Sequence, residues 1–162
     1  MIIHYMQDRD RALPLSPIPR KNWEIDAYPV NEIAEYVQDV SQGDIDVLVE
    51  EYYNKYDMIL DGRDPEEFKE HVAVQAGIEI GFERFLEEKN YQAIVTHFGD
   101  LGALKQLPGL AIQRLMEKGY GFGGEGDWKT AAMGIEAVYI DGDTTIRNLQ
   151  NELRWNSMYF SK

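Results

Sequence analysis

The sequence contains no cysteine, which excludes disulfide bonds and thiolate metal sites. It has no apolar run near the roughly 20 residues that a membrane-spanning helix needs, and no signal-peptide pattern opens it. Basic residues are in deficit, because 16 Lys and Arg face 29 Asp and Glu, a formal net charge of −13. That excess of negative charge argues against nucleic acid and anionic membranes as partners. We therefore expect a cytoplasmic protein with a solvated acidic surface.

Hydrophobic periodicity predicts a single α/β domain over residues 23–162, preceded by an N-terminal extension or linker at residues 1–22. Within that extension, residues 1–6 have the pattern of a short strand. Further strands are expected near 23–30, 91–98 and 135–140. Helices are expected near 31–40, 44–57, 65–89, 108–118, 127–133 and 144–154. The predicted fold class is therefore α/β, a three-layer Rossmann-like domain with a small, mainly parallel sheet flanked by helices.

Polar residues, proline and glycine mark the expected ends of these helices. Asn31 and Asp44 are placed to cap the helices that follow them, and Pro65 to occupy the first position of the longest helix. Two glycines on the longest helix, Gly77 and Gly81, lie four residues apart, which predicts close packing against a neighbour.

The glycine-rich stretch at residues 119–130, GYGFGGEGDWKT, is the strongest functional candidate. It has five glycines in eight residues, with one carboxylate, Glu125, among them. Glycine allows positive φ and close backbone approach, so we interpret the stretch as a loop that brings main chain near a ligand. Glu125 is then either a hard-metal ligand or acid–base group, or a cap for the next helix. A phosphate-binding loop is disfavoured, because no strand plainly leads into the stretch and Glu125 would repel a phosphate.

Other aromatic and histidine residues have plainer interpretations. The tyrosines at 52, 53 and 56 are expected in the core or at an interface rather than as a platform for a sugar. His71 is expected at the surface or in packing rather than as a ligand. Three residues at the carboxyl end of the 91–98 strand, His97, Phe98 and Asp100, are expected near any site, because ligands of α/β sheets gather there.

Two long segments carry a family resemblance. Residues 119–132, GYGFGGEGDWKTAA, resemble the signature of L-arabinose isomerase, and residues 104–116, LKQLPGLAIQRLM, resemble the helix that precedes it in that family. Residues 134–147 and 151–159 resemble the family's extreme C-terminus. The resemblance thus covers residues 23–162 in two blocks, the central-domain segment and the C-terminal tail, that flank an internal deletion.

The resemblance implies an aldose–ketose isomerase that uses Mn²⁺ and converts L-arabinose to L-ribulose and, more slowly, D-galactose to D-tagatose. It implies an aldopentose or aldohexose as substrate and copies of the same chain as partners in a homo-oligomer. Glu125 matches a glutamate that is both catalytic and a metal ligand, and Phe98 matches a substrate-binding position. The family's second glutamate and both histidine ligands belong to the deleted block. Gly99 and Gly102 replace a glutamate and a histidine of the family pattern, and His97 replaces a threonine.

Three functional hypotheses follow from these losses. The first is an isomerase of reduced size, with a site rebuilt from the acidic and histidine residues that remain: Glu125, Asp127, Asp100, His97 and Asp141 or Asp143. The second is a non-catalytic module that keeps the α/β scaffold and assembles with itself or with a full-length relative. The third is a sugar-binding protein whose pocket retains Phe98 and Glu125 without turnover.

Overall fold

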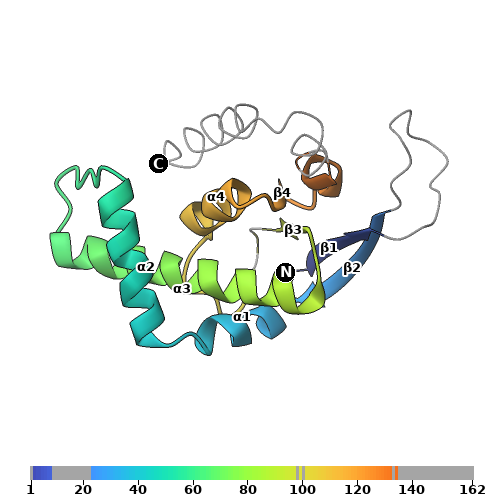
Figure 1. Cartoon of the computed structure of the whole chain (residues 1–162), viewed down its shortest axis with the longest axis horizontal. Coiled ribbons are helices and arrows are strands. Elements are labelled where there is room, and N and C mark those ends of the chain that lie inside the picture. Colours follow the sequence, from blue (N-terminus) through green and yellow to red (C-terminus); the bar gives the residue numbers. More distant parts are fainter. Residues whose placement is uncertain (1, 9–22, 98, 100, 133, 135–162) are drawn as a thin grey trace.

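The sheet at the centre of the protein has four strands in the order β2-β1-β3-β4. The computed structural model describes residues 2–8, 23–97, 99, 101–132 and 134 (Figure 1). The strands are β1 (Ile2–Asp8), β2 (Trp23–Pro29), β3 (Ala93–Thr96) and β4 (Gly121–Gly124). The predicted strands near 23–30 and 91–98 are confirmed as β2 and β3.

The sheet is mixed, because β1 lies between β2 and β3 and runs antiparallel to both. His4 is paired with Ala27 of β2 on one side and with Val95 of β3 on the other. The α/β class, with a small sheet flanked by helices, is confirmed. The mainly parallel arrangement that we expected holds for β3 and β4 alone. The short strand expected at residues 1–6 is also confirmed, so the sheet includes residues that precede the predicted domain start at residue 23.

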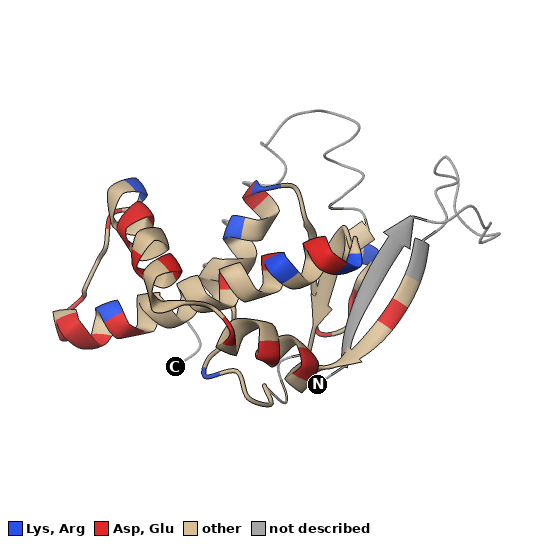
Figure 2. Cartoon of the chain, turned by 60° about the horizontal axis from the view of Figure 1, so that its bottom comes forward, with Lys and Arg blue, Asp and Glu red and all other residues tan. Residues whose placement is uncertain are grey.

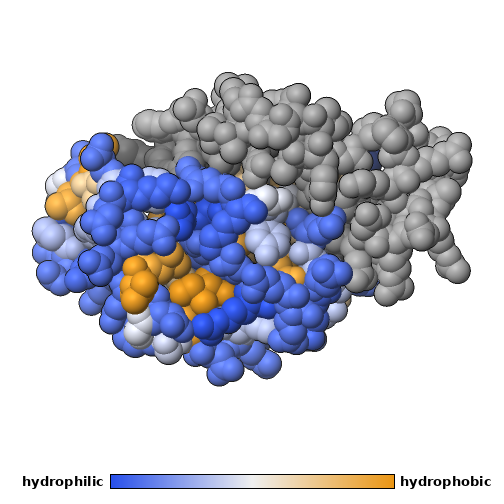
Figure 3. Space-filling model, in the orientation of Figure 1, coloured by the Kyte–Doolittle hydropathy of each residue, from blue (hydrophilic) through white to orange (hydrophobic). Residues whose placement is uncertain are grey.

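Among the residues that the structure describes, the four longer helices are α1 (Val30–Gln38), α2 (Gln42–Lys55), α3 (Pro65–Lys89) and α4 (Gly109–Glu117). Three of them, α1, α3 and α4, pack in the core on one face of this sheet, and α2 packs against α3. None of the helices in the described part is long and apolar enough to cross a membrane. Asp and Glu positions are spread along the helices (Figure 2). In the view of Figure 3, the described surface is mostly hydrophilic, with small separate apolar patches.

Side-chain capping bonds mark the start of α2 and α3, and two of the predicted caps are wrong. The α2 cap is Ser41, whose Oγ accepts a hydrogen bond from the backbone N–H of Asp44 at 3.2 Å, so the helix starts before Asp44. The cap of α1 is Pro29, which makes no side-chain capping bond. Asn31 lies inside the first turn of α1, where its Oδ1 accepts from the backbone N–H of Ala103 at 3.1 Å. Asn31 therefore tethers a distant loop instead of capping a helix.

The two faces of β3 pack against different layers. Ile94, on one face, belongs to the main hydrophobic core, which α1, α3 and α4 cover. Ala93 and Val95, on the other face, pack with Ala131 and Ala132 of the helical turn at residues 128–132. Helical segments thus lie on both faces of the sheet, as the predicted three-layer arrangement requires. The strand expected at 135–140 and the helix expected at 144–154 lie outside the described residues.

Close approach of α1 to α3 requires glycine at one of the two predicted positions. A Cβ atom at Gly81 would lie 2.6 Å from Val37 Cα, which no side chain tolerates without a shift of backbone. A Cβ atom at Gly77 would lie 3.5 Å from Ile45 Cδ1, an ordinary van der Waals distance. The prediction of close packing is therefore confirmed, and position 81 is the one at which this packing requires glycine.

Candidate functional site

The glycine-rich stretch forms a strand before it forms a turn, which corrects the prediction of a loop throughout. β4 pairs in parallel with β3, and the backbone N–H of Gly121 donates to Gln92 O at 2.9 Å. Phe122 is buried in the main core. A Cβ atom at Gly123 would lie 1.9 Å from Asp127 O, so glycine is needed here because the chain folds back over the strand. These glycines are thus strand residues that allow a tight return of the backbone.

Glu125 follows β4 directly and sits at the tip of that return. Its φ is 55° and that of Gly126 is 83°, so both residues are in the left-handed region. A non-glycine residue held at positive φ typically costs about 1–3 kcal/mol, and such residues gather at functional sites. The turn is fixed by the Asp127 N–H bond to Gly124 O at 3.0 Å. The side chain of Glu125 is 58% exposed, so its carboxylate is open to a ligand.

His97 follows β3 directly and lies beside Glu125. Its Nε2 is 3.4 Å from Glu125 Oε2, and its side chain is 55% exposed. The two residues meet because β3 and β4 are adjacent and parallel, so both strands end at the same edge of the sheet. Gly126 N–H donates to Thr96 O at 3.3 Å and joins the two strand ends through the backbone. The structure thus brings together two of the residues that the sequence placed at this candidate site, His97 and Glu125.

Asp127 has a structural task in this region. Its Oδ1 accepts from the backbone N–H of Thr130 at 3.1 Å, and its Oδ2 accepts from the Thr130 hydroxyl. These bonds cap the helical turn at residues 128–132. The alternative that Glu125 caps this helix is therefore wrong, because Asp127 occupies that place.

The described residues do not by themselves form a complete metal site. The other predicted site residues, Phe98, Asp100, Asp141 and Asp143, lie outside the described residues. Within the described part of the chain, no group of three or more His, Asp or Glu side chains is arranged to hold a metal ion. At the candidate site the described part offers two side chains, Glu125 and His97. Mn²⁺ prefers octahedral coordination with about six ligands, so two side chains are too few. Further ligands would have to come from elsewhere for Mn²⁺ to bind tightly.

Gly99 and Gly102, where the family pattern has a glutamate and a histidine, are tightly confined in this structure. Gly102 has a φ of 54°, and a Cβ atom there would lie 2.4 Å from both Asn31 Oδ1 and Val30 Cγ1. A Cβ atom at Gly99 would lie 2.8 Å from His97 Cε1. A glutamate at position 99 would displace His97, and a histidine at position 102 would displace residues of α1. The two glycines therefore fit the close packing around them.

Replacement of Gly102 by Ala is expected to lower the free energy of unfolding by about 1–3 kcal/mol. The methyl group would displace Asn31 and weaken its bond to Ala103. Urea unfolding would measure the loss. The matched control is Gly62→Ala, because Gly62 also has positive φ (80°) but has no atom within 4 Å of its would-be Cβ. Equal losses in the two variants would contradict a role for the contact with Asn31.

A second polar cluster, which sequence reasoning missed, lies between α2, α3 and α4. Glu79 of α3 has no exposed surface, and Arg114 of α4 is 5% exposed. Arg114 Nε lies 3.3 Å from Glu79 Oε2, and Lys118 Nζ lies 2.8 Å from Glu79 Oε1. The hydroxyl of Tyr52 on α2 donates to Glu79 Oε2. We refer to Glu79, Arg114, Lys118 and Tyr52 as the buried ionic cluster.

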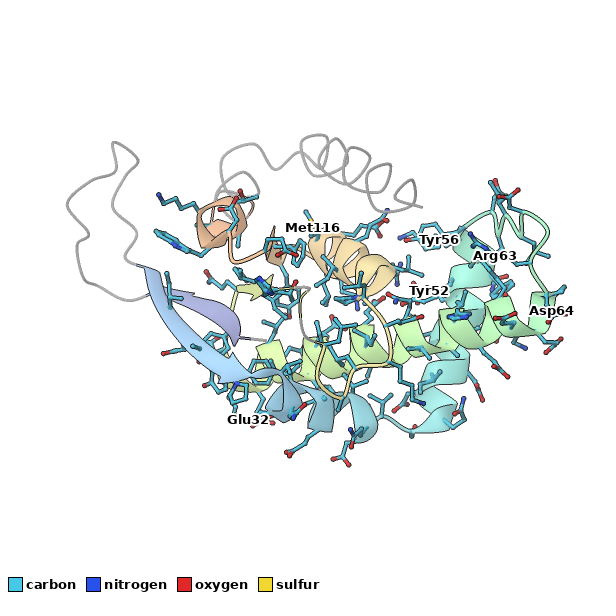
Figure 4. The ribbon with its side chains drawn as sticks, turned by 180° about the vertical axis from the view of Figure 1, so that it is seen from behind. Glu32, Tyr52, Tyr56, Arg63, Asp64 and Met116 are labelled. Atoms are coloured by element: carbon cyan, nitrogen blue, oxygen red, sulfur yellow. The ribbon has the colours of Figure 1, made fainter. Side chains whose placement is uncertain are left out.

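The tyrosines of α2 help to close this cluster. Tyr52 of α2 and Tyr56, which directly follows that helix, both point toward α4 (Figure 4). Burial, together with the charge of Glu79, raises the pKa of Tyr52 far above its usual range, so the hydroxyl remains a donor. Tyr52 is fully buried, as expected of a core tyrosine, whereas Tyr53 is 42% exposed. A sequence signal for the cluster did exist, since Glu79 lies three residues before Phe82 and seven after Val72, on the apolar face of α3.

Comparison with known proteins identifies the family to which this architecture belongs. The family model described as the L-arabinose isomerase central domain matches residues 19–141. An L-arabinose isomerase of Geobacillus stearothermophilus is 45% identical over 124 residues, which cover 76% of this chain and 25% of that protein. The corresponding enzyme of Serratia proteamaculans is 48% identical over 121 residues, 74% of this chain and 24% of that protein.

The match includes the site, because Glu125, His97 and both parallel strands lie between residues 19 and 141. The chain spans about a quarter of the length of the curated relatives that it matches. On this evidence the chain belongs to the L-arabinose isomerase family, and its residues 19–141 correspond to the family's central domain.

Proposed function

We propose that this chain takes part in aldose–ketose isomerisation of the L-arabinose isomerase type, the conversion of L-arabinose to L-ribulose and of D-galactose to D-tagatose. One observation carries the proposal. The carboxylate of Glu125 is exposed at the carboxyl edge of β3 and β4, within the segment that matches the isomerase central domain. That edge is where ligands of α/β sheets gather.

The chemistry of this reaction suits a carboxylate. Isomerisation moves one hydrogen from C2 to C1 and one from O2 to O1 of the sugar, so it needs no external oxidant or reductant. A base takes up a proton and returns it to the neighbouring carbon through an enediol. In this proposal Glu125 is the catalytic base, and Phe98 contacts the sugar.

Mn²⁺ is part of the proposal, with Glu125 as one ligand. The described residues offer too few donors to hold the ion tightly, so the remaining ligands would come from other residues of the chain or from another subunit. The cytoplasmic location and the homo-oligomeric state expected from the sequence belong to the same proposal.

The direct test is incubation of the protein with L-arabinose and, separately, with D-galactose, with and without MnCl₂, followed by an assay for ketose. We expect ketose from both sugars when MnCl₂ is present and much less after treatment with a chelator. Absence of ketose under every metal condition would overturn the proposal. Sugar binding without ketose would then favour a sugar-binding protein. A stable oligomer that binds neither MnCl₂ nor sugar would favour a non-catalytic module.

A further inference from the structure

The hydrogen bonding of His97 restricts which of its ring nitrogens carries the proton. The backbone N–H of Gly99 donates to His97 Nδ1 at 3.1 Å. A nitrogen that accepts a hydrogen bond has no proton of its own, so in the neutral ring the proton is on Nε2. Nε2 is the atom that lies 3.4 Å from Glu125 Oε2. The ring therefore directs an N–H group toward the carboxylate.

The same contact disfavours His97 as a metal ligand through Nε2. A ligating nitrogen must offer its lone pair, which would move the proton of the neutral ring to Nδ1. That proton would then face the N–H of Gly99, and two donors would oppose each other. The Gly99 contact thus favours His97 as a hydrogen-bond donor.

The surrounding backbone limits where the His97 ring and the Glu125 turn can lie. Gly99 leaves no room for a Cβ atom beside the imidazole, since such an atom would lie 2.8 Å from His97 Cε1. On the other side, Gly126 N–H bonds to Thr96 O and keeps the Glu125 turn against the end of β3. The imidazole and the backbone of Glu125 are therefore held at a shared edge of the sheet by local contacts.

We propose that His97 is a positioning residue that orients the carboxylate of Glu125 through its Nε2–H group. This inference rests on the proposed function for its catalytic consequence, because an oriented carboxylate is useful where it must meet a sugar. Misplacement of a reacting group by about 1 Å can cost about 100-fold in rate. His97 itself need not touch the substrate. The family pattern has a threonine at this position, so the contact between an imidazole N–H and Glu125 is a feature of this chain rather than of that pattern.

The first arm of the test needs no activity. In the full chain with ¹⁵N-labelled histidine, long-range ¹H–¹⁵N correlation spectra report which ring nitrogen carries the proton. The spectra would be recorded about two pH units above the usual histidine pKa. We expect the Nε2–H form for His97, and a shift of its Nε2 resonance in Glu125→Ala. A Nδ1–H form, or a resonance that Glu125→Ala leaves unchanged, would overturn the proposal.

The chain offers a matched control for this arm. His71 and Glu67 form another exposed pair, with Nε2 3.9 Å from Glu67 Oε1, one helical turn apart on α3. Glu67→Ala should leave the resonances of His97 unchanged. A change in His97 of the same size would mean that the response is general rather than local to Glu125.

The second arm measures ketose formation. We expect His97→Ala to lower kcat about 10- to 100-fold with little change in KM, and His97→Gln to recover much of the loss because its amide also donates. In a Glu125→Gln background, His97→Ala should cost nothing further, and His71→Ala should leave activity unchanged. Full activity in His97→Ala would overturn the positioning role. If the wild-type chain forms no ketose, the proposed function fails, and the first arm alone decides whether His97 contacts Glu125.

Discussion

Replacement of Glu125 by Gln is expected to lower the rate of ketose formation by about 10²–10⁴-fold. Glutamine keeps the length and shape of the side chain but accepts no proton, and proton transfer by a placed carboxylate typically contributes that much to a rate. The fold should be retained, because the side chain is 58% exposed and glutamine adopts the same backbone conformation. Initial rates with L-arabinose and MnCl₂ would measure the effect, and urea unfolding would verify the fold.

The comparison variant is Glu70→Gln on the exposed surface of α3. It removes the same charge from the chain at a position outside the site, so its rate should match the wild type. A Glu125→Gln protein that keeps more than about a tenth of the rate would contradict the assignment of the base. An equal loss in both variants would point to net charge rather than to the site.

The second large effect is expected in the buried ionic cluster. Replacement of Arg114 by Ala should lower the free energy of unfolding by about 3–5 kcal/mol, because it removes the buried cation beside Glu79 and leaves that buried carboxylate with the partly exposed Lys118. Arg114 also contacts Glu51 and lies over the ring of Tyr52, so the variant loses packing between α2 and α4 as well. Such a loss is a large part of the roughly 5–15 kcal/mol that is typical of the free energy of unfolding of a domain. Urea unfolding would measure it.

Two further variants separate the buried charge from other causes. Arg84→Ala removes another arginine that pairs with a carboxylate, Asp44 at 2.9 Å, but at an exposed position, so its unfolding midpoint should hardly change. The double variant Arg114→Met with Glu79→Leu removes both charges and should be more stable than Arg114→Ala alone. If the double variant loses as much stability as Arg114→Met and Glu79→Leu lose separately when added together, coupling between Glu79 and Arg114 is contradicted.

Local signals predicted the longest helix well. Asp64 accepts from the N–H groups of Glu66 and Glu67, Pro65 takes the first position, and Asn90 ends the helix in the left-handed region. Each of these signals acts within a few residues, so it could be identified without knowledge of the fold. The predicted range of residues 65–89 is confirmed as α3.

Elements that depend on distant partners were harder to predict. β4 is nearly all glycine, a residue with low strand propensity, and it is a strand because β3 lies beside it. The place of β1 within the sheet likewise depends on pairing with β3, far along the chain. Asn31 was expected to cap its own helix, and it bonds to Ala103 instead. In each case tertiary contact overrides the local preference.

The candidate site was predictable in part, because some of its signals are local and others depend on tertiary contacts. The rule that ligands gather at the carboxyl ends of strands predicted that His97 lies near a site, and the glycine pattern singled out Glu125. Their mutual contact depends on β4 being the parallel neighbour of β3, which the sequence did not indicate. The hydrogen bond from the Gly99 N–H to His97 Nδ1 and the burial of Glu79 depend on the detailed geometry of the folded chain, which periodicity describes only in outline.

The central place of β1 has a consequence for how the domain folds. β3, α4 and β4 follow one another closely, so their pairing closes a short loop, whereas the β1–β3 ladder joins His4 to Val95 and closes a long one. Loop-closure entropy makes contacts of large sequence separation slower to form. We therefore expect the β1–β2 hairpin and the β3–α4–β4 unit to arise early and to dock late. The edge that carries Glu125 then belongs to a unit that can assemble before the rest of the sheet is complete.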